Sequence, residues 1–164
     1  MKYFTYELLT SINNESLEDS KLEELENTWG KNRDLYWEQF SLLSDRLPKD
    51  VYSRFNTQGF HDYLIEKVEI KHTNLLNTSI DLFVSNSEEQ WKITFDNIIS
   101  FNFDHLNKDN PAPIFSPEQD LWVYEELIPV NNKIISFEVL CQSGANLKVE
   151  FKDSGISIQE LSKF

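Results

Sequence analysis

The adjacent residues His61 and Asp62 carry the side-chain types of acid–base chemistry. A carboxylate can orient an imidazole as a general base, and both groups are common metal ligands. Together with His105, they define one candidate function, a small enzyme or metal-dependent protein centred on these three side chains. Neighbouring residues point apart at the start of a strand, so His61 and Asp62 need not touch. The alternative is structural, with Asp62 capping a turn and His61 bonded to backbone at the entry to a sheet.

Other catalytic signatures are missing from the sequence. A metal site can be drawn from positions 61, 72, 104 and 105, but their spacing does not match a ligand motif such as HExxH. The scattered glycines exclude a glycine-rich phosphate loop, and no serine lies in a Gly-x-Ser-x-Gly turn. Cys141 is the only cysteine, and its apolar neighbours predict a buried, inert thiol without a disulfide. We therefore predict a non-enzymatic protein without a metal or cofactor.

The charge balance indicates a class of partner. The 164 residues include 28 acidic and 15 basic ones, which gives a formal net charge of −13. This field repels phosphate backbones, so nucleic acid is not an expected partner, whereas it steers a basic protein inward and raises its association rate. Solubility is the alternative explanation of the same charge. Residues 104–128 are the densest acidic segment, with six acids against Lys108 alone.

Aromatic side chains ringed by acids can anchor a basic partner. Trp122 and Tyr124 lie in such a setting, and Trp37 lies just beside the apolar stripe of a predicted helix. The alternative for Trp122 is a central strand buried on both faces. The acidic start of the long helix is a second candidate surface, although such a run is usually only the solvated face of an amphipathic helix. The predicted partner-binding residues are Asp104, Asp109, Glu118, Asp120, Trp122, Tyr124, Glu125 and Glu126, with Glu23 and Glu24 on the helix.

Helical periodicity in the first third of the chain positions the second of these surfaces. Apolar residues recur at steps of three, four and seven between Leu22 and Leu47, which describes one face of a helix. Gly30 lies inside this pattern, so a kink or break is expected there. Shorter helices are predicted within residues 3–12 and through residues 51–55.

After Gly59 the hydrophobic period changes to two, which predicts strands. Asn97 is interpreted as a bend or bulge inside the strand-forming stretch 91–103. Residues 104–119 are predicted to form one long irregular loop, because three prolines block regular structure. Helices segregated from strands predict an α+β fold, with N-terminal helices packed on a curved, mainly antiparallel sheet of six or seven strands. The chain 1–164 is predicted to be a single domain, helical over 1–58 and strand-rich over 59–164.

Two short motifs carry a resemblance. The segment Met1 to Leu8, MKYFTYEL, resembles the start of a family of uncharacterised bacterial proteins, a domain of unknown function. Members of that family join a helical first half to a strand-rich second half through an apolar-His-Asp step, which here is Phe60-His61-Asp62. Similar His-Asp-strand patterns occur in predicted immunity proteins of bacterial toxin systems, which are small, acidic and cytoplasmic. The resemblance supplies no catalytic residues.

These observations together predict an acidic binding protein, specifically an immunity protein that neutralises a basic toxin domain such as a nuclease. No signal peptide is expected, because Glu7 interrupts the apolar residues near the start. No stretch approaches the roughly 18 consecutive apolar residues of a membrane span. We therefore expect a cytoplasmic protein without a membrane partner. The sequence specifies neither the toxin nor the oligomeric state.

Overall fold

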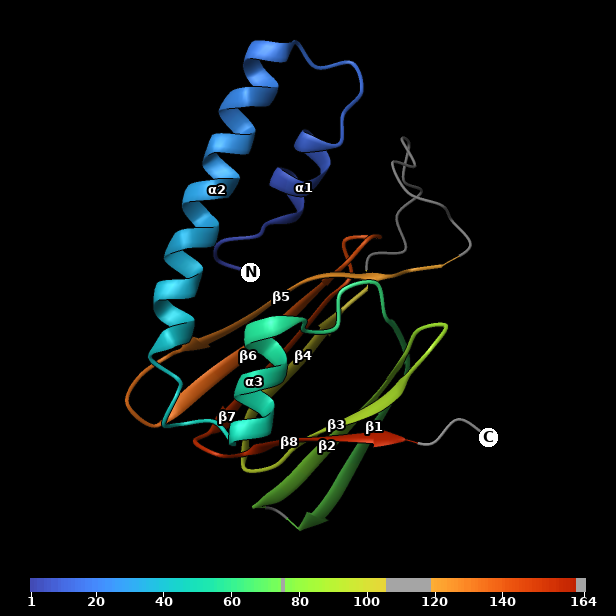
Figure 1. Ribbon diagram of the computed structural model, residues 1–164. Helices are drawn as coiled ribbons and strands as arrows, with labels where there is room; N and C mark the ends of the chain where they lie inside the picture. The colour runs from blue at the N-terminus through green and yellow to red at the C-terminus, as the bar shows by residue number, and fades with distance from the viewer. Residues whose placement is uncertain (75, 106–118, 162–164) are drawn as a thin grey trace.

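Helices precede strands along the chain, as the change of hydrophobic period predicts. The computed structural model describes residues 1–74, 76–105 and 119–161. Helices α1 (Tyr6–Ile12), α2 (Asp19–Ser41) and α3 (Lys49–Thr57) come before all the strands, so the predicted α+β class is confirmed (Figure 1). The strands in the described residues are β1 (Leu64–Asn74), β2 (Asn77–Ser85), β3 (Gln90–Phe95), β4 (Ile98–Asp104), β5 (Trp122–Pro129), β6 (Ile134–Cys141), β7 (Asn146–Lys152) and β8 (Ile156–Leu161).

The strands form two antiparallel sheets of four, in the orders β1-β2-β3-β8 and β4-β7-β6-β5. The expectation of one curved sheet of six or seven strands is therefore wrong. The chain changes sheet after Phe95, because β3 pairs with β2 and β8 whereas β4 pairs with β7. At this corner Asn97 has φ = 54°, in the left-handed region that asparagine tolerates better than most side chains. The residue interpreted as a bend inside one stretch of strand is the corner between two sheets.

The core lies between the two sheets, where aromatic rings from both meet. The ring centroid of Phe95 lies 5.1 Å from that of Phe137 and 5.3 Å from that of Phe151, across the two sheets. Helix α3 adds Phe55, whose ring lies 5.8 Å from that of Phe137. Such ring pairs add to the burial of apolar area. Helices α2 and α3 and both sheets share this cluster of buried side chains, whereas Leu9 of α1 packs in a smaller one with Val123 and Leu140.

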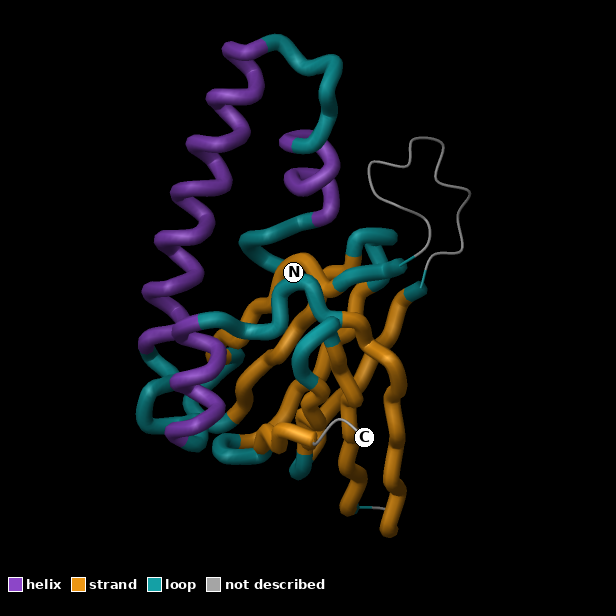
Figure 2. The backbone as a smooth tube through the Cα atoms, turned by 45° about the vertical axis from the view of Figure 1, so that its right-hand side comes forward, coloured by secondary structure: helices purple, strands orange, loops and turns teal. Residues whose placement is uncertain are grey.

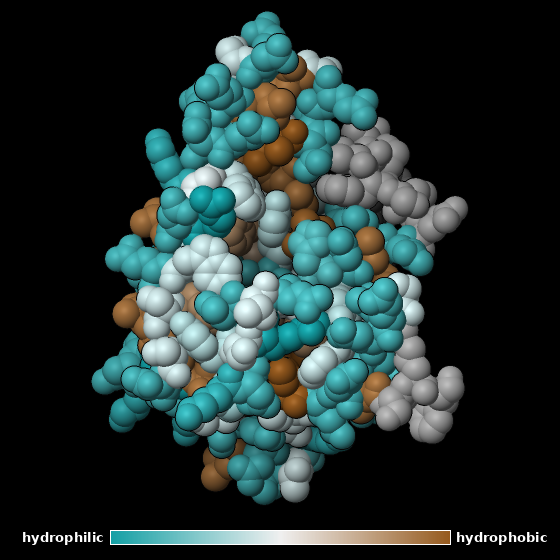
Figure 3. Space-filling view, viewed as in Figure 1, coloured by the Kyte–Doolittle hydropathy of each residue, from teal (hydrophilic) through white to brown (hydrophobic). Residues whose placement is uncertain are grey.

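Helix α2 is continuous over 23 residues and about 34 Å long at 1.5 Å per residue. Gly30 does not interrupt it, so the expected kink or break is absent. The C-terminal half buries Tyr36 and Phe40 beside β5, whereas the N-terminal half projects beyond the sheets with α1 next to it (Figures 1 and 2). Apolar side chains form a strip on these two projecting helices, with hydrophilic side chains around it (Figure 3). The projecting half carries the acidic start of α2 away from the sheets.

The predicted irregular loop, residues 104–119, falls mostly outside the described part of the chain. β4 ends at its first residue, Asp104, and β5 begins at Trp122. Within the described residues, no helix is both long and apolar enough to cross a membrane.

Candidate functional site

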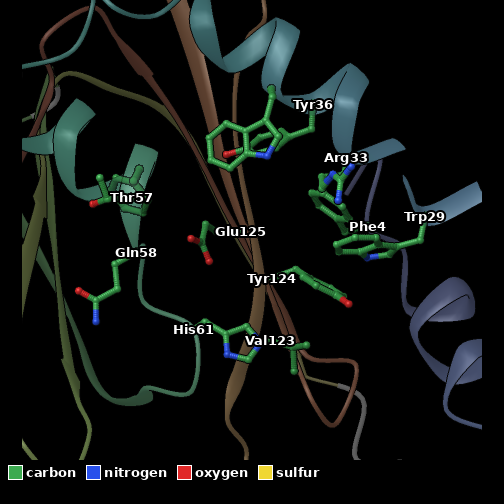
Figure 4. A pocket seen from close by; sticks show the side chains of 12 residues that line it. Phe4, Trp29, Arg33, Tyr36, Thr57, Gln58, His61, Val123, Tyr124 and Glu125 are labelled. Carbon is green, nitrogen blue, oxygen red and sulfur yellow. The ribbon is translucent and has the colours of Figure 1, made fainter. Parts of the chain in front are cut away.

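A cavity of about 230 Å³ opens between α2, the end of α3 and β5. We call it the aromatic cleft, since rings form most of its walls. Figure 4 shows the carboxyl group of Glu125 lying among these side chains rather than behind them. The ring-bearing wall residues are Phe4, Trp29, Tyr36, Trp37, Phe55 and Tyr124.

Glu125 faces the cleft because β5 carries a β-bulge. The pairing register of β5 with β6 shifts between Trp122 and Tyr124, which inserts one extra residue into the strand. Strict alternation would place Trp122 and Glu125 on opposite faces of the sheet. The bulge brings them to the same face, and Trp122 Nε1 donates a hydrogen bond of 2.6 Å to Glu125 Oε2. Trp122 therefore orients Glu125 from within the core.

The protein surrounds the carboxyl group of Glu125, although part of the side chain lines the cleft. Burial raises the pKa of this group from its ordinary 4.5 to about 7. The hydrogen bond from Trp122 is the largest opposing influence, followed by His61, the Phe60 backbone N–H and Arg54. Both protonation states are therefore populated near neutral pH. Such a group can exchange a proton or pair with an incoming cation.

Gly59 fixes the position of Glu125 from the loop after α3. Its φ is 58°, and a Cβ built on it would overlap Glu125 Oε1. We expect Gly59→Ala to lower the free energy of unfolding by about 2 kcal/mol, because the left-handed backbone is strained and the carboxyl group must move. Urea unfolding checks this, with Gly30→Ala as the control because a Cβ there meets nothing within 4 Å. Equal stability of the two variants would contradict the role assigned to Gly59.

His61 and Asp62 are in contact, so the prediction that they point apart is wrong. His61 Nδ1 lies 3.0 Å from Asp62 Oδ2. Asp62 has φ = 66°, and its backbone N–H donates to the carbonyl of Trp122. This left-handed residue lies before β1 and turns the chain, so the two side chains converge as they would not in an extended strand. Both are exposed, and His61 lines the aromatic cleft together with Glu125.

The remaining histidines lie away from the cleft. His72 Nδ1 lies 2.7 Å from Thr78 Oγ1, and His105 lines a different cavity. In the parts of the chain that the structure describes, no three His, Cys, Asp or Glu side chains lie close enough to hold a metal ion. The centre drawn from His61, Asp62 and His105 is therefore not assembled. Only the first two of these residues share the cleft with Glu125.

Several of the predicted partner-binding acids are exposed. Asp104 is exposed at the end of β4, and Glu23 and Glu24 are exposed on the projecting half of α2. Asp109 and Glu118 lie outside the described residues. The helix therefore presents acidic groups that a partner can reach.

Asp120 and Tyr124 have structural partners instead. Asp120 accepts hydrogen bonds of 2.8 Å from the backbone N–H of Ser143 and 2.7 Å from its hydroxyl, which holds the turn between β6 and β7. Tyr124 is half-buried and stacks on Phe4, with the ring centroids 5.0 Å apart. Tyr124 still forms part of the cleft wall, so a partner that enters the cleft can reach it.

Trp122 and Glu126 are buried, which for Trp122 matches the alternative of a central strand and not that of a surface anchor. Trp122 is 0% exposed and cannot anchor a partner at the surface, whereas Trp37 is 38% exposed beside the cleft. Glu126 is 1% exposed. Its carboxylate accepts three backbone N–H hydrogen bonds of 2.7 to 2.8 Å from residues 2–4. It therefore attaches the N-terminal segment to β5 and is closed to a partner.

A polar cluster next to the cleft is missed by sequence reasoning altogether. Glu89 Oε2 accepts hydrogen bonds of 2.7 Å from both Tyr63 and Trp91, and Arg54 lies 3.4 Å from the same oxygen. The four residues come from α3, the loop before β1, the β2–β3 turn and the start of β3. Their spacing in the sequence marks no pattern, because only the packing of these segments brings them together.

The single cysteine behaves as predicted. Cys141 is free and buried, and burial raises its pKa to about 12, with a further increase from the nearby charge of Asp120. A thiol with so high a pKa is almost entirely protonated at neutral pH and is a poor nucleophile.

No protein-family model matches the chain, and no curated protein matches it significantly. The resemblance to an uncharacterised bacterial family therefore stays a prediction.

Proposed function

We propose that this chain is an acidic, non-enzymatic binding protein that neutralises a basic partner, as an immunity protein neutralises a toxin domain such as a nuclease. The row of exposed acids at the start of α2 carries the proposal. Residues 15–26 hold six acids against Lys21 alone, and α2 projects from the sheets there (Figure 1). We call this surface the acidic ridge, formed by Glu15, Glu18, Asp19, Glu23, Glu24 and Glu26.

The acidic ridge suits a partner that itself binds nucleic acid. A nuclease presents lysine and arginine side chains to phosphate groups, and a projecting row of carboxylates offers those cations a competing surface. Opposite charges accelerate association and make it sensitive to salt. Trp37 and part of the wall of the aromatic cleft belong to the C-terminal half of α2. They provide the apolar contact that such an interface also needs. We further propose that the complex forms in the cytoplasm.

Co-expression with the product of the neighbouring reading frame tests this function, since immunity genes lie beside the genes of their toxins. We expect that product to arrest the growth of a host when expressed alone, and this chain to restore growth. Arrest that this chain does not relieve would contradict the proposal.

Charge reversal on the acidic ridge should slow binding to that product. We expect Glu23→Lys with Glu24→Lys to lower the association rate constant about tenfold at low salt, because the steering field is inverted locally. The matched control is Glu88→Lys with Glu160→Lys, which makes the same change of charge at exposed sites on the β1-β2-β3-β8 sheet and its β2–β3 turn. Stopped-flow fluorescence measures both rates, and equal slowing by the two double variants would exclude the ridge.

A second candidate function, a small enzyme, is favoured by one observation. Glu125, with a pKa of about 7, shares the cleft with the imidazole of His61, which Asp62 holds. A group protonated near neutral pH beside an imidazole is an arrangement used in acid–base catalysis. His61→Asn separates the two functions in the co-expression assay. If this chain relieves growth arrest by catalysis, the His61→Asn variant should no longer relieve it. If the chain relieves growth arrest by binding, the variant should still relieve it.

A further inference from the structure

The aromatic cleft holds a carboxyl group that the acidic ridge does not explain. We propose that the cleft receives one lysine or arginine side chain of the basic partner, with the cationic group between the aromatic walls and against Glu125. This inference rests on the proposed function, because the occupant belongs to the same partner.

The walls and floor of the cleft match the chemistry of a cationic side chain. Ammonium and guanidinium groups are attracted to the faces of aromatic rings within about 6 Å, and a carboxylate adds a charge-assisted hydrogen bond. Tyr36, Trp37 and Tyr124 supply the rings, and Glu125 supplies the carboxylate. The cavity of about 230 Å³ is many times the roughly 10–15 Å³ that one water molecule requires on the same measure, so a side chain can enter it.

The same chain contains a filled arrangement of this kind. The Arg54 guanidinium lies 4.7 Å from the ring centroid of Phe60 and 4.8 Å from that of Trp91. It also lies 3.4 Å from a carboxylate oxygen of Glu89. Aromatic rings, a carboxylate and a guanidinium are thus assembled around Glu89. Around Glu125 the rings and the carboxyl group are present, but the guanidinium that also lines the cleft, that of Arg33, pairs with Asp34 and not with Glu125.

The pKa values of Glu89 and Glu125 are shifted in opposite directions by their surroundings. Hydrogen bonds from Tyr63 and Trp91, with a contribution from Arg54, hold the pKa of Glu89 below its ordinary value. Burial instead raises the pKa of Glu125, and the hydrogen bond from Trp122 with the smaller opposing influences does not offset it. A cation in the cleft would reverse this imbalance, because it favours the ionised form of the carboxyl group.

The charged side chains near Glu125 are already paired elsewhere. In the described residues, no lysine or arginine forms an ion pair with it. The charge of ionised Glu125 is therefore not matched by an ion pair within the described residues. The existing pairs around the cleft are Arg54 with Glu89, Arg33 with Asp34, and His61 with Asp62.

Trp29 provides a second, independent indication of a ligand. Its buried Nε1 has no hydrogen-bond partner within the described residues. Burial raises the pKa of Tyr124 and the Trp29 indole partly offsets this, yet no hydrogen bond of good geometry joins the two groups. Trp29 lines both the aromatic cleft and an adjoining cavity along α2. A backbone carbonyl of an inserted partner segment would satisfy this donor.

Two small probes test the inference directly. N-acetyl-arginine N-methylamide carries the guanidinium, and the matching citrulline derivative has the same shape without the charge. We expect the arginine probe to shift the indole NMR signals of Trp29 and Trp37 in a saturable way, and the citrulline probe to bind at least tenfold more weakly. Apparent affinity should rise roughly thirtyfold from pH 5.5 to 8, because only the ionised fraction of Glu125 pairs with the cation.

Variants identify the carboxyl group responsible. Glu125→Gln keeps an oxygen for the Trp122 hydrogen bond and should weaken the arginine probe at least tenfold and remove its pH dependence. Trp37→Ala removes one exposed wall and should weaken it severalfold, whereas Glu24→Gln on the acidic ridge should leave it unchanged. Equal binding of the two probes, or wild-type binding by Glu125→Gln, would overturn the inference.

The inference and the proposed function can fail separately. If the wild-type protein relieves growth arrest and Glu125→Gln binds the toxin with unchanged affinity, the proposed cation pocket is overturned and the binding function stands. If the arginine probe binds as expected but no toxin is relieved, the binding function is contradicted and the cation pocket stands.

Discussion

Glu126→Ala is expected to lower the free energy of unfolding by about 4 kcal/mol, the largest loss among the variants considered. The Glu126 carboxylate accepts the backbone N–H groups of Tyr3 and Phe4 at 2.7 and 2.8 Å in a buried setting, and that of Lys2 at 2.8 Å nearer the surface. Alanine leaves the two buried donors without acceptors, at about 2 kcal/mol each. The detached segment also exposes the Tyr3 and Phe4 rings, which belong to the core.

Urea unfolding followed by tryptophan fluorescence measures the effect of Glu126→Ala. Glu126→Gln should lower the free energy of unfolding by about half as much, because its amide oxygen can still accept some of the three backbone hydrogen bonds. The control is Glu24→Ala on the exposed face of α2, for which we expect a change within about 0.5 kcal/mol. A Glu126→Ala protein as stable as the Glu24→Ala protein would show that the N-terminal segment does not depend on this carboxylate.

The second large effect is on how stability depends on pH. The pKa of Glu125 rises from about 4.5 in the unfolded chain to about 7 in the folded protein, so the folded state binds this proton more tightly. The resulting stabilisation is complete below pH 4.5 and is lost as the pH rises through 7. A shift of this size corresponds to about 3 kcal/mol.

Glu125→Gln isolates this contribution, because glutamine cannot ionise but keeps an acceptor for Trp122. We expect the variant to gain about 3 kcal/mol relative to wild type when the pH is raised from 4.5 to 8. Glu89, whose pKa is lowered in the folded protein, contributes stability that is lost as the pH falls, and it does so equally in both proteins. Urea unfolding at half-unit pH intervals gives the difference, and a flat difference across this range would refute the raised pKa.

Local sequence patterns were sufficient to predict the elements and their class. The switch from helical to alternating periodicity after Gly59 separates the helices from the strands, and the structure follows it. The continuous α2 shows that one glycine does not break a helix that is held by tertiary packing at Tyr36 and Phe40. The sequence also predicts that the acidic residues at the start of this helix are exposed, because they lie off its apolar face.

Two local irregularities of the backbone explain why the number of sheets and the faces of the site residues are not predicted from the sequence. The corner at Asn97 divides what alternation presents as one stretch between two sheets. The bulge between Trp122 and Tyr124 turns Trp122 and Glu125 to the same face, which moves the tryptophan from a surface anchor to the core. Neither irregularity changes the alternation of side-chain types on either side of it, so periodicity alone does not reveal it.

The sequence by itself determined the α+β class, the order of helices and strands, the buried thiol and the acidic start of α2. The tertiary structure alone decided the division into two sheets, the contact of His61 with Asp62, and the different roles of two adjacent glutamates. Burial by distant segments raises the pKa of Glu125 against the opposing hydrogen bond from Trp122, whereas Glu126 binds backbone groups up to 124 positions away. Periodicity reports only which face of an element is apolar. What a carboxyl group does is set by the charges and donors that distant segments bring within a few ångströms of it.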